Sequence, residues 1–449
     1  MSLSGRAERV AQGRALRKSI PRSSHAAWPT IAGRPRPIDL LEESHEARLP
    51  ELAAVRWGRM VSSPFRFLRG SALVMAWDLA HLPHGELYVQ ACGDAHLCNF
   101  GVFGTPERSI IFDLRDFDET LPAPWEWDVK RLAASIEVAG RERGLSRGRT
   151  EEGVRVCLRD YRQTMRESLS LMHKEIWYRR VDAEALAESM SKKARRYLKK
   201  SLKKARRRTS KREMEKLTVV GDDGERHIRP DPPLIFPLED EHARDVARGL
   251  FGEYASTLSP DRRMIFDRYH LVDLAYRVVG VGSVGTRCMV ALFLGDGDDD
   301  PLFLQMKEAN RSVLEPFARR CPYANQGERV VQGQRIIQAA SDIFLGWKTS
   351  AGHDYYVRQL KDMKGTVDVE DLHPSVFVLF AGLCGRTLAQ AHARSGDFCG
   401  IAGYLGKSDA FDVAVAQFAR AYADQVERDH QALADAVRRG RLPAELGLH

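Results

Sequence analysis

The chain has few cysteines and no arrangement of them that suggests a disulfide framework. Its seven cysteines are scattered, odd in number, and include no C-x-x-C pair. This usage predicts reduced thiols and a cytoplasmic location. The sequence has no uninterrupted run of the roughly 18 apolar residues that a membrane-spanning helix needs, and its basic N-terminus has no apolar core of a secretory signal. We expect no membrane partner and a disordered basic tail over residues 1–37.

Two further absences narrow the fold and the chemistry. No internal repeat at a solenoid period of about 20–50 residues is present. No G-x-S-x-G elbow is present, which disfavours a Ser-His-Asp hydrolase. What remains is an ordinary globular composition, with 43% hydrophobic and 29% charged residues in a chain of 449. That length is sufficient for two or three domains.

The positive net charge of +8 is concentrated in one tract. Residues 192–212 hold 13 lysines and arginines and no acidic residue, so the rest of the chain is net acidic. The tract has helical propensity, few apolar positions and one aromatic residue, Tyr197. The simpler interpretation is a solvated helix. The alternative is a surface for a nucleic-acid or acidic partner.

The apolar spacing predicts an α+β protein. Long segments near both ends of the chain and in its middle repeat apolar residues at three- and four-residue spacing. Two short strands, ELYVQA and SIIFDL, bracket a polar loop near residue 94. Over about residues 270–362, glycine and acidic turns separate strand-like runs, with one helix at about 326–340.

The strongest chemical signal is an ordered set of polar residues. The loop CGDAHLCN at residues 92–99 contains Asp94 and Asn99, and Asp113, Asp116 and Asp118 follow it. Phosphoryl transfer from a nucleotide needs a carboxylate beside the attacking hydroxyl, and an amide and a second carboxylate that hold magnesium. Aspartate and asparagine are also common in turns, so the order of the set, and not any single residue, favours catalysis.

This stretch resembles the catalytic and magnesium loops of the aminoglycoside-phosphotransferase and choline-kinase branch of the protein-kinase-like superfamily. There the pattern is H-G-D-x-H-x-x-N, followed by a strand that ends in I-D-F or I-D-W. The resemblance implies that Asp94 is the catalytic aspartate and that Asn99 and Asp116 bind magnesium, with Asp113 and Asp118 as competitors of Asp116. Cys92 departs from the pattern, because the branch usually has histidine there.

Two further stretches carry resemblances. Residues 124–129, PWEWDV, resemble the D-P-x-x-D-L-A helix start of the same kinase-like branch. The chain from about residue 38 also looks like a bacterial family of unassigned function, the domain of unknown function 2252. The shared stretches are SPFRFLRG, CGDAHLCNFG, DFDET and PWEWDVKRLA.

A glycine-rich loop forms the second chemical signal. It lies between two predicted strands, and Lys307 ends the strand that follows them. A glycine loop lets backbone N–H groups approach phosphates, and a lysine on a neighbouring strand can pair with them. Because the loop does not open a helix, a Rossmann site is disfavoured. The candidate nucleotide-binding residues are Gly280, Gly282, Ser283, Gly285, Thr286 and Lys307.

A kinase also needs a helix carboxylate that pairs with this lysine. Glu328, in the predicted helix at about 326–340, is the first candidate for Lys307. Glu315 is a second candidate, and Glu308 could point away.

The order of the motifs is reversed relative to an ordinary kinase, in which the glycine loop precedes the catalytic loop. Residues 383–397 resemble the helix that normally leads into the catalytic loop, yet they lie near the end of this chain. The pieces therefore suggest a circular permutation, which is tolerated where the joined ends lie close together. We expect a two-lobed, permuted kinase-like fold in which large-lobe segments 38–149 and 363–449 enclose a helical insertion, 150–269, and a small lobe, 270–362.

The resulting hypothesis is an ATP- and magnesium-dependent phosphotransferase that acts on a hydroxyl acceptor, most simply a small molecule. Two alternatives use the same site: a pseudokinase that binds nucleotide for regulation, and a protein that transfers the nucleotidyl group. A third alternative is a nucleic-acid-binding protein that uses residues 192–212.

Overall fold

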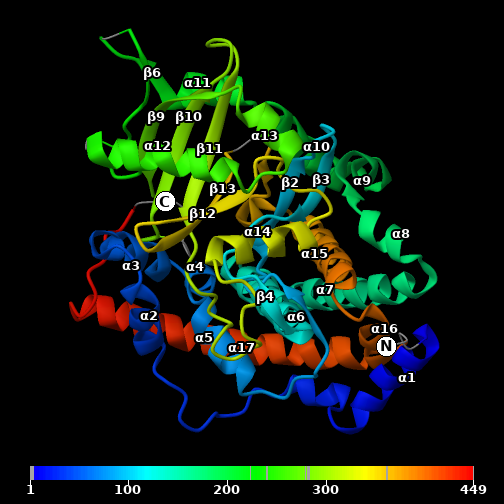
Figure 1. Cartoon of the computed structure of the whole chain (residues 1–449). Coiled ribbons are helices and arrows are strands. Elements are labelled where there is room, and N and C mark those ends of the chain that lie inside the picture. Colours follow the sequence, from blue (N-terminus) through cyan, green and yellow to red (C-terminus); the bar gives the residue numbers. More distant parts are fainter. Residues whose placement is uncertain are drawn as a thin grey trace.

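The computed structural model of the chain describes residues 5–222, 224–238, 241–278, 280, 284–360 and 363–447. Helices and strands are mixed along the chain, so the protein is α+β, as predicted. In Figure 1 a sheet coloured green to yellow stands above a body of blue, cyan, orange and red helices. Both ends of the chain therefore contribute to the same helical body.

The larger sheet is antiparallel. Its strands, in order across the sheet, are β12 (Gly346–Ser350), β13 (His353–Gln359), β11 (Pro301–Glu308), β10 (Cys288–Leu294), β9 (His270–Arg277) and β8 (Ile235–Pro237). Every residue of β10 and β11 is buried, so the centre of the sheet is covered on both faces. One face packs on α12 (Glu241–Ala255) and α13 (Pro260–Phe266), and the other on α11 (Ser210–Leu217) and the hairpin of β6 (Thr218–Val220) and β7 (Arg226–Ile228).

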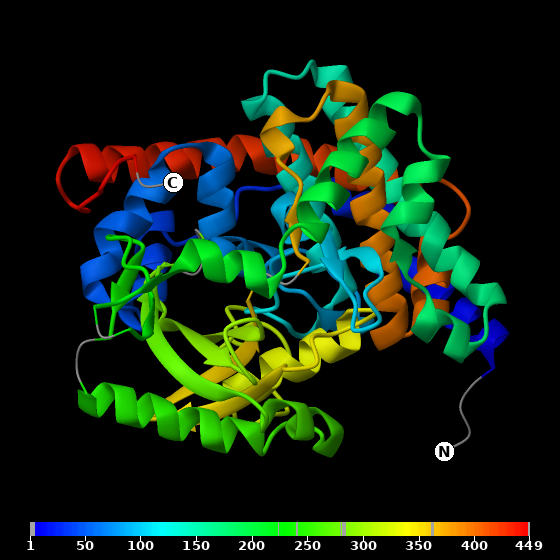
Figure 2. The ribbon, with the colours of Figure 1, turned by 90° about the horizontal axis from the view of Figure 1, so that it is seen from above.

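Short strands frame the polar loop near residue 94. β1 (Tyr88–Ala91) pairs with β4 (Leu121–Pro124), whereas β2 (Phe100–Gly104) and β3 (Ile110–Leu114) belong to a second small sheet with β14 (Gly365–Thr366) and β5 (Val181–Asp182). The two predicted strands are therefore confirmed, but they lie in different sheets. In Figure 2 this cyan region lies between the green and yellow sheet and the orange helix α15 (Pro374–Ser395).

The helical body is built around α6 (Trp125–Glu142), α7 (Arg147–Glu167), α15 and α17 (Ala410–Arg438). α6 is buried along nearly its whole length. α7 and α15 approach so closely that a Cβ at Gly385 would lie 2.1 Å from the carbonyl oxygen of Cys157. Four shorter helices pack against this core: α2 (Pro37–Glu46), α3 (Ala53–Val61), α4 (Pro64–Gly70) and α5 (Ala72–Ala80).

α15 is the one helix of the described residues that is long and apolar enough to cross a membrane by length and composition. Of its apolar window, 89% is buried inside the protein. Such burial is the property of a core helix, because a membrane span exposes apolar side chains to lipid. α15 therefore serves as the central packing element between α7 and the small strands.

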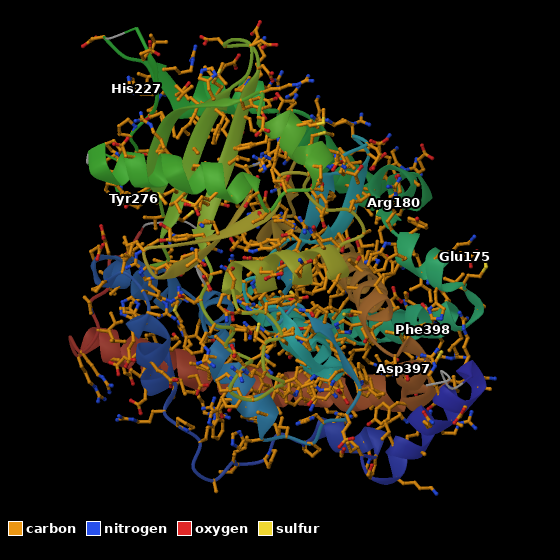
Figure 3. The ribbon with its side chains drawn as sticks, viewed as in Figure 1. Glu175, Arg180, His227, Tyr276, Asp397 and Phe398 are labelled. Atoms are coloured by element: carbon orange, nitrogen blue, oxygen red, sulfur yellow. The ribbon has the colours of Figure 1, made fainter. Side chains whose placement is uncertain are left out.

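The prediction that residues 1–37 are a disordered tail is wrong for residues 5–37, the part that the structure describes. Residues 6–26 form α1 (Arg6–Ala15) and two short 3₁₀ turns, Leu16–Lys18 and Arg22–Ala26. α1 packs closely on α16 (Phe398–Leu405), and Figure 3 shows Asp397 and Phe398 beside it. Arginines of this segment bind α16 and its flanks: Arg9 pairs with Asp397 at 3.0 Å, and Arg22 donates to the Leu405 carbonyl at 2.7 Å. The basic composition that suggested disorder is used to bind the carbonyls at a helix end.

Residues 150–269 do not form a separate insertion. α7 lies in the core of the helical body, and β5 pairs with β3. At the other end of the range, β8 is an edge strand of the larger sheet and α12 covers one of its faces. The β-rich part therefore begins before residue 270. The prediction missed this because a strand of three residues carries no periodic signal.

Candidate functional site

Five of the predicted site residues, Asp94, Asn99, Asp116, Asp118 and Gly280, line one cleft of about 250 Å³. Its wall combines segments that are far apart in the sequence: residues 44–73, residues 94–119, Gly280, Val313 and Arg358. The wall is unusually rich in charge. Five arginines line it, Arg48, Arg56, Arg69, Arg115 and Arg358, together with four carboxylates, Asp94, Asp116, Asp118 and Glu119.

Asp94 lies in the loop that follows β1, residues 92–99, which we name the acid loop. Gly93 has φ +83°, and a Cβ there would lie 2.3 Å from the carbonyl oxygen of Glu119, so the turn requires glycine. Arg131 Nε donates to Asp94 Oδ1 at 2.6 Å. Desolvation raises the pKa of Asp94 above its ordinary value, and the Arg131 guanidinium opposes that rise. The carboxylate is thus held by one arginine at the cleft wall.

The start of α6 holds the acid loop in place. The Asp128 carboxylate accepts the backbone N–H groups of Cys92 at 2.6 Å and Gly93 at 2.9 Å. The same carboxylate lies 3.2 Å from His392 Nε2, near the end of α15. His392 is fully buried and packs at the end of its helix. One buried carboxylate therefore joins the acid loop, α6 and α15.

Asn99 joins the acid loop to the loop that follows β3. Its Nδ2 donates to the carbonyls of Asp94 at 3.2 Å and Asp116 at 3.0 Å. Its Oδ1 accepts the backbone N–H of Asp116 at 2.7 Å. The structure thus brings the three residues together. The amide oxygen of Asn99 accepts backbone N–H groups, so it is not open to coordinate a metal ion.

The three competing aspartates have different environments. Asp113 is buried away from the cleft, where its two oxygens accept the N–H groups of Leu114 and Ala339 at 2.9 Å each. Asp116 is exposed to the cleft, and no described residue makes a hydrogen bond to its carboxylate. Desolvation in the cleft and the neighbouring Asp118 raise the pKa of Asp116. Asp116 is therefore the carboxylate most open to a cation, and Asp113 has a structural role.

Lys307 reaches the cleft through Asp118. It is 2% exposed and lies on β11, opposite Cys288 of β10. Its Nζ forms a close ion pair with Asp118 Oδ2, and the Tyr356 hydroxyl donates to Asp118 Oδ1 at 2.7 Å. Burial opposes both charges, yet the mutual attraction raises the pKa of Lys307 and lowers the pKa of Asp118. Two motifs that lie 189 residues apart therefore meet at this pair.

The glycine loop joins β9 to β10, and its described ends contact the N-terminal part of the chain. Gly280 and Gly285 have φ +63° and +89°, values that favour glycine. Arg59 Nη1 donates to the Gly280 carbonyl, and the backbone N–H of Leu49 donates to the Gly285 carbonyl at 2.8 Å. Among the predicted residues, Gly280 lines the cleft, Thr286 lies in the turn before β10, and Gly282 and Ser283 lie outside the described residues.

The expected pairing of Glu328 with Lys307 is wrong in this structure. Glu328 lies in the first turn of α14 (Gln326–Ile337), and the Asn325 side chain caps its backbone N–H at 2.8 Å. The next residue, Arg329, points into the protein. It is 1% exposed and donates to the carbonyls of Thr120, Asp118 and Asn310, each at 2.8 Å. A shift of one residue along a helix changes the face by about 100°, which decides this outcome.

The other two carboxylates considered for Lys307 also point elsewhere. Glu315 pairs with Arg311 at 3.0 Å. Glu308 points away from the cleft, as one alternative had it, and pairs with Arg287 at 3.1 Å and lies 2.9 Å from His353 Nδ1. Lys307 therefore meets an aspartate of the second loop in place of a helix glutamate.

Magnesium binding can be tested against these side chains. Within the described ranges, no three histidine, cysteine or acidic side chains are grouped closely enough to hold a metal ion. Magnesium in nucleotide sites commonly takes only one or two carboxylates, with phosphate oxygens and waters as its other ligands. Asp116 fits that requirement, with Asp118 next to it.

The basic tract forms α10 (Lys192–Arg206) and the start of α11. Ala194, Leu202 and Ala205 are buried, and nearly all of the lysines and arginines of the tract are exposed or half-buried at the surface. The tract is therefore a surface helix packed by a narrow apolar edge. A nucleic-acid or acidic partner there stays a prediction.

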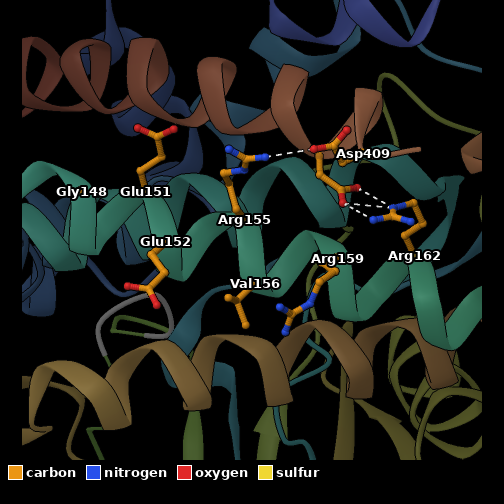
Figure 4. A pocket seen from close by; sticks show the side chains of 9 residues that line it. Gly148, Glu151, Glu152, Arg155, Val156, Arg159, Arg162 and Asp409 are labelled. Carbon is orange, nitrogen blue, oxygen red and sulfur yellow. Dashed lines mark hydrogen bonds and ion pairs between the residues drawn. The ribbon is translucent and has the colours of Figure 1, made fainter. Parts of the chain in front are cut away.

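A second charged hollow, of about 660 Å³, lies between α7 and the start of α17. Figure 4 shows two of its arginines, Arg155 and Arg162, directed at carboxylates. Arg155 pairs with Asp409 at 3.0 Å, and Arg162 pairs with Asp412 at 2.8 Å. Arg159 pairs with its neighbour, Asp160, at 2.8 Å. Each arginine of this hollow thus has an acidic partner within the protein.

Several residues in or next to the cleft wall were not predicted from the sequence. Arg131, Arg329, Arg56 and Arg69 were not singled out, although Arg69 lies in SPFRFLRG and Arg131 in PWEWDVKRLA. Their position in stretches that resemble the family was the one sequence feature that could have identified Arg69 and Arg131. The chain has too many arginines for residue type alone to identify these four.

The comparisons with known proteins identify the family. A family model described as an uncharacterized protein conserved in bacteria (DUF2252) matches residues 48–436. The chain belongs to this family. The match spans the acid loop, the glycine loop and Lys307, and it confirms the predicted resemblance to DUF2252. None of the curated proteins and no solved structure matches the chain.

Proposed function

We propose that this DUF2252 protein is an ATP- and magnesium-dependent phosphotransferase that acts on a hydroxyl acceptor. The observation that carries the proposal is the ion pair of Lys307 with Asp118 in a cleft that also contains Asp94 and Asp116. A lysine on a central strand, a carboxylate open to a cation and a carboxylate for the acceptor are the parts that phosphoryl transfer needs. Lys307 and Asp118 are 189 residues apart in the chain, so a local turn does not explain why these groups meet.

The nucleotide side of the site is the end of the cleft near β11. Lys307 would bind the α- and β-phosphates beneath the glycine loop. In this structure Asp118 partly neutralises the charge of that lysine. Asp116 would hold magnesium, with Asp118 as the second carboxylate. When bound, magnesium neutralises charge on the phosphate oxygens. Asn99 would act by fixing the position of Asp116, since its amide oxygen accepts that residue's N–H.

The acceptor side is the end near the acid loop. Asp94 is open enough to receive a hydroxyl, with a side chain that is 22% exposed. Its pKa is raised by desolvation, which favours proton acceptance over permanent ionisation. Arg131 would keep the carboxylate in one orientation while the hydroxyl attacks.

The reversed order of the motifs is compatible with the geometry of the chain. A Cβ at Gly396, directly after α15, would lie 2.8 Å from the carbonyl oxygen of Tyr88, where β1 begins. The end of the late helix and the start of the catalytic strand are thus neighbours in space. A short connection between them would restore the order of an ordinary kinase, which is the property expected of a circular permutation.

One observation favours the second candidate, a nucleotide-binding pseudokinase. Asp94 and Asp118 are each held by a cation in this structure, Arg131 and Lys307. Tight pairing would lower activity if it persisted in the nucleotide complex. The two candidates share the nucleotide site and differ only in whether transfer occurs.

The test is incubation of the protein with magnesium and ATP labelled at either the α- or the γ-phosphorus, followed by product separation. We expect γ-label in free phosphate or an acceptor and none from α-label, and a loss in Asp94→Asn. Transfer of α-label would indicate nucleotidyl chemistry instead. Nucleotide binding without any transfer would support the pseudokinase.

A further inference from the structure

Two arginines of the cleft wall, Arg56 and Arg69, have no acidic partner among the described residues and also have a buried Nε that makes no hydrogen bond. Arg56 is fully buried, and its hydrogen bonds go to neutral oxygens, the Leu41 carbonyl at 3.2 Å and Ser44 Oγ at 2.7 Å. Its Nε is buried without a partner. Arg69 Nε is likewise buried without a partner, and in the part of the chain that the structure describes Arg69 forms no ion pair.

A buried cation without a counter-charge is costly, and proteins normally pair it. Arg131 and Lys307, which lie behind the cleft wall, follow that rule, because Asp94 and Asp118 of the wall neutralise them. Burial lowers the pKa of Arg56 well below its ordinary value, which reflects the same missing counter-charge. The cleft therefore retains positive charge that the protein does not neutralise.

The position of Arg69 indicates which ligand group would supply the counter-charge. The carbonyl of the preceding residue, Leu68, accepts a hydrogen bond from Arg131 Nη2 at 2.9 Å, and Arg131 holds Asp94, so Arg69 lies at the acceptor end of the cleft. Its charge also lowers the pKa of Asp94, against the larger effect of desolvation. It also depresses the pKa of His96, which burial already lowers. Lys307 exerts its influence on Asp118 and Asp116 at the other end. The unpaired charge is thus next to the carboxylate that would receive the hydroxyl.

We propose that the acceptor is itself an anion, a hydroxyl-bearing small molecule whose phosphate or carboxylate group binds Arg69, with Arg56 supplying further positive charge to the cleft. This inference rests on the proposed phosphotransferase activity. In the transfer, the acceptor oxygen forms a bond to the γ-phosphorus and the bond from that phosphorus to the bridging oxygen of ADP breaks. The hydroxyl proton passes to Asp94.

The same anionic chemistry has a second possible source, the terminal phosphate of the nucleotide. The two sources can be separated by whether a bound nucleotide competes with phosphate for the arginine. A group of the acceptor binds beside a bound nucleotide, whereas a site for the nucleotide's own phosphate is filled when the nucleotide is present.

Titration calorimetry of the full chain with inorganic phosphate distinguishes the sources, with and without saturating magnesium and a non-hydrolysable ATP analogue. We expect phosphate to bind in both conditions, and Arg69→Gln to weaken it about 10- to 100-fold while analogue affinity stays within about twofold. Arg69→Lys, which keeps the charge but loses the two-pronged geometry, should give an intermediate loss. Arg66→Gln, on the same helix but outside the cleft wall, is the matched control and should change nothing.

Displacement of phosphate by the analogue would overturn the inference and assign the arginine to the nucleotide. If Arg69→Gln leaves the phosphate affinity unchanged while the protein still binds the analogue, the proposal of an anionic acceptor is wrong and the proposed phosphotransferase is unaffected. Absence of any analogue binding would instead refute the proposed phosphotransferase.

Discussion

The molecule has two hollows rich in arginine, and they differ in how the charges are paired. In the hollow between α7 and α17, Arg155, Arg159 and Arg162 each contact a carboxylate. In the cleft, Arg56 and Arg69 contact none among the described residues. Size and residue type do not separate the two, since the neutralised hollow is the larger, at about 660 Å³ against about 250 Å³.

This difference shows that a functional site is better recognised by charge that is left unpaired than by charge alone. Ion pairs satisfied within the protein contribute to folding and leave nothing for a ligand. Charges left open at a cleft wall cost folding energy and are compensated when a ligand binds. The comparison therefore predicts that substitutions in the cleft change function, and that substitutions in the hollow change at most stability.

The largest expected effect is on catalysis in the cleft. Asp94→Asn should reduce phosphoryl transfer about 10²- to 10⁴-fold, because the amide cannot accept the hydroxyl proton. Nucleotide affinity should change little, since Asp94 lies at the acceptor end. Steady-state kinetics and nucleotide titration measure the two quantities. Asp409→Asn, in the hollow, is the control and should leave both unchanged; equal loss of binding and turnover in Asp94→Asn would contradict its role.

The next effect is on stability in the hollow, and it separates two ion pairs. Arg162 and Asp412 are buried, with side chains 8% and 2% exposed, so Arg162→Gln should cost about 3–5 kcal/mol of unfolding free energy. Arg155 and Asp409 are 45% and 59% exposed, so Arg155→Gln should cost less than about 1 kcal/mol. Chemical denaturation measures both. A change in nucleotide binding by either variant would remove the distinction between hollow and cleft.

The smallest effect concerns a third kind of charge, a buried carboxyl group in the helical core. Glu126 accepts the Gly85 N–H at 2.9 Å, and burial raises its pKa from 4.5 to about 7. Between those values the folded state binds more protons than the unfolded state, so this group makes stability fall as pH rises. Glu126→Gln stays neutral and should remove that fall.

Thermal melts of wild type and Glu126→Gln at about pH 5 and about pH 8 test this sign. The melting temperature of the variant relative to wild type should be higher at the upper pH than at the lower. The same difference at both pH values would mean that Glu126 is ionised throughout.

The local part of the site could be predicted from the sequence, because its residues lie within one loop and one strand. Asp94, Asn99 and Asp116 are close in the chain, and their ordered spacing survives in the cleft. Lys307 was also predicted, since the register of β10 and β11 places it near the end of the glycine loop. Short-range spacing and strand alternation carry enough information for these residues.

The rest depends on contacts between distant segments. The choice of Arg329 over Glu328 follows from the face of α14 that packs on the core, which periodicity over one turn does not decide. The N-terminal helix α1 is ordered because it packs on α16 and its flank, and its Arg9 bonds to Asp397, 388 residues later. The absence of a counter-charge at Arg69 is a property of the folded cleft, and no spacing rule indicates it.

The central claim is that the acid loop and the glycine-loop strand form one nucleotide site. A thermal-shift titration with ATP and magnesium on wild type, Lys307→Ala and Asp116→Ala tests it most directly, because a ligand that binds only the folded state raises the melting temperature. We predict a magnesium-dependent rise in wild type that both variants lose. No rise with any nucleotide, or a rise that both variants retain, would contradict the claim.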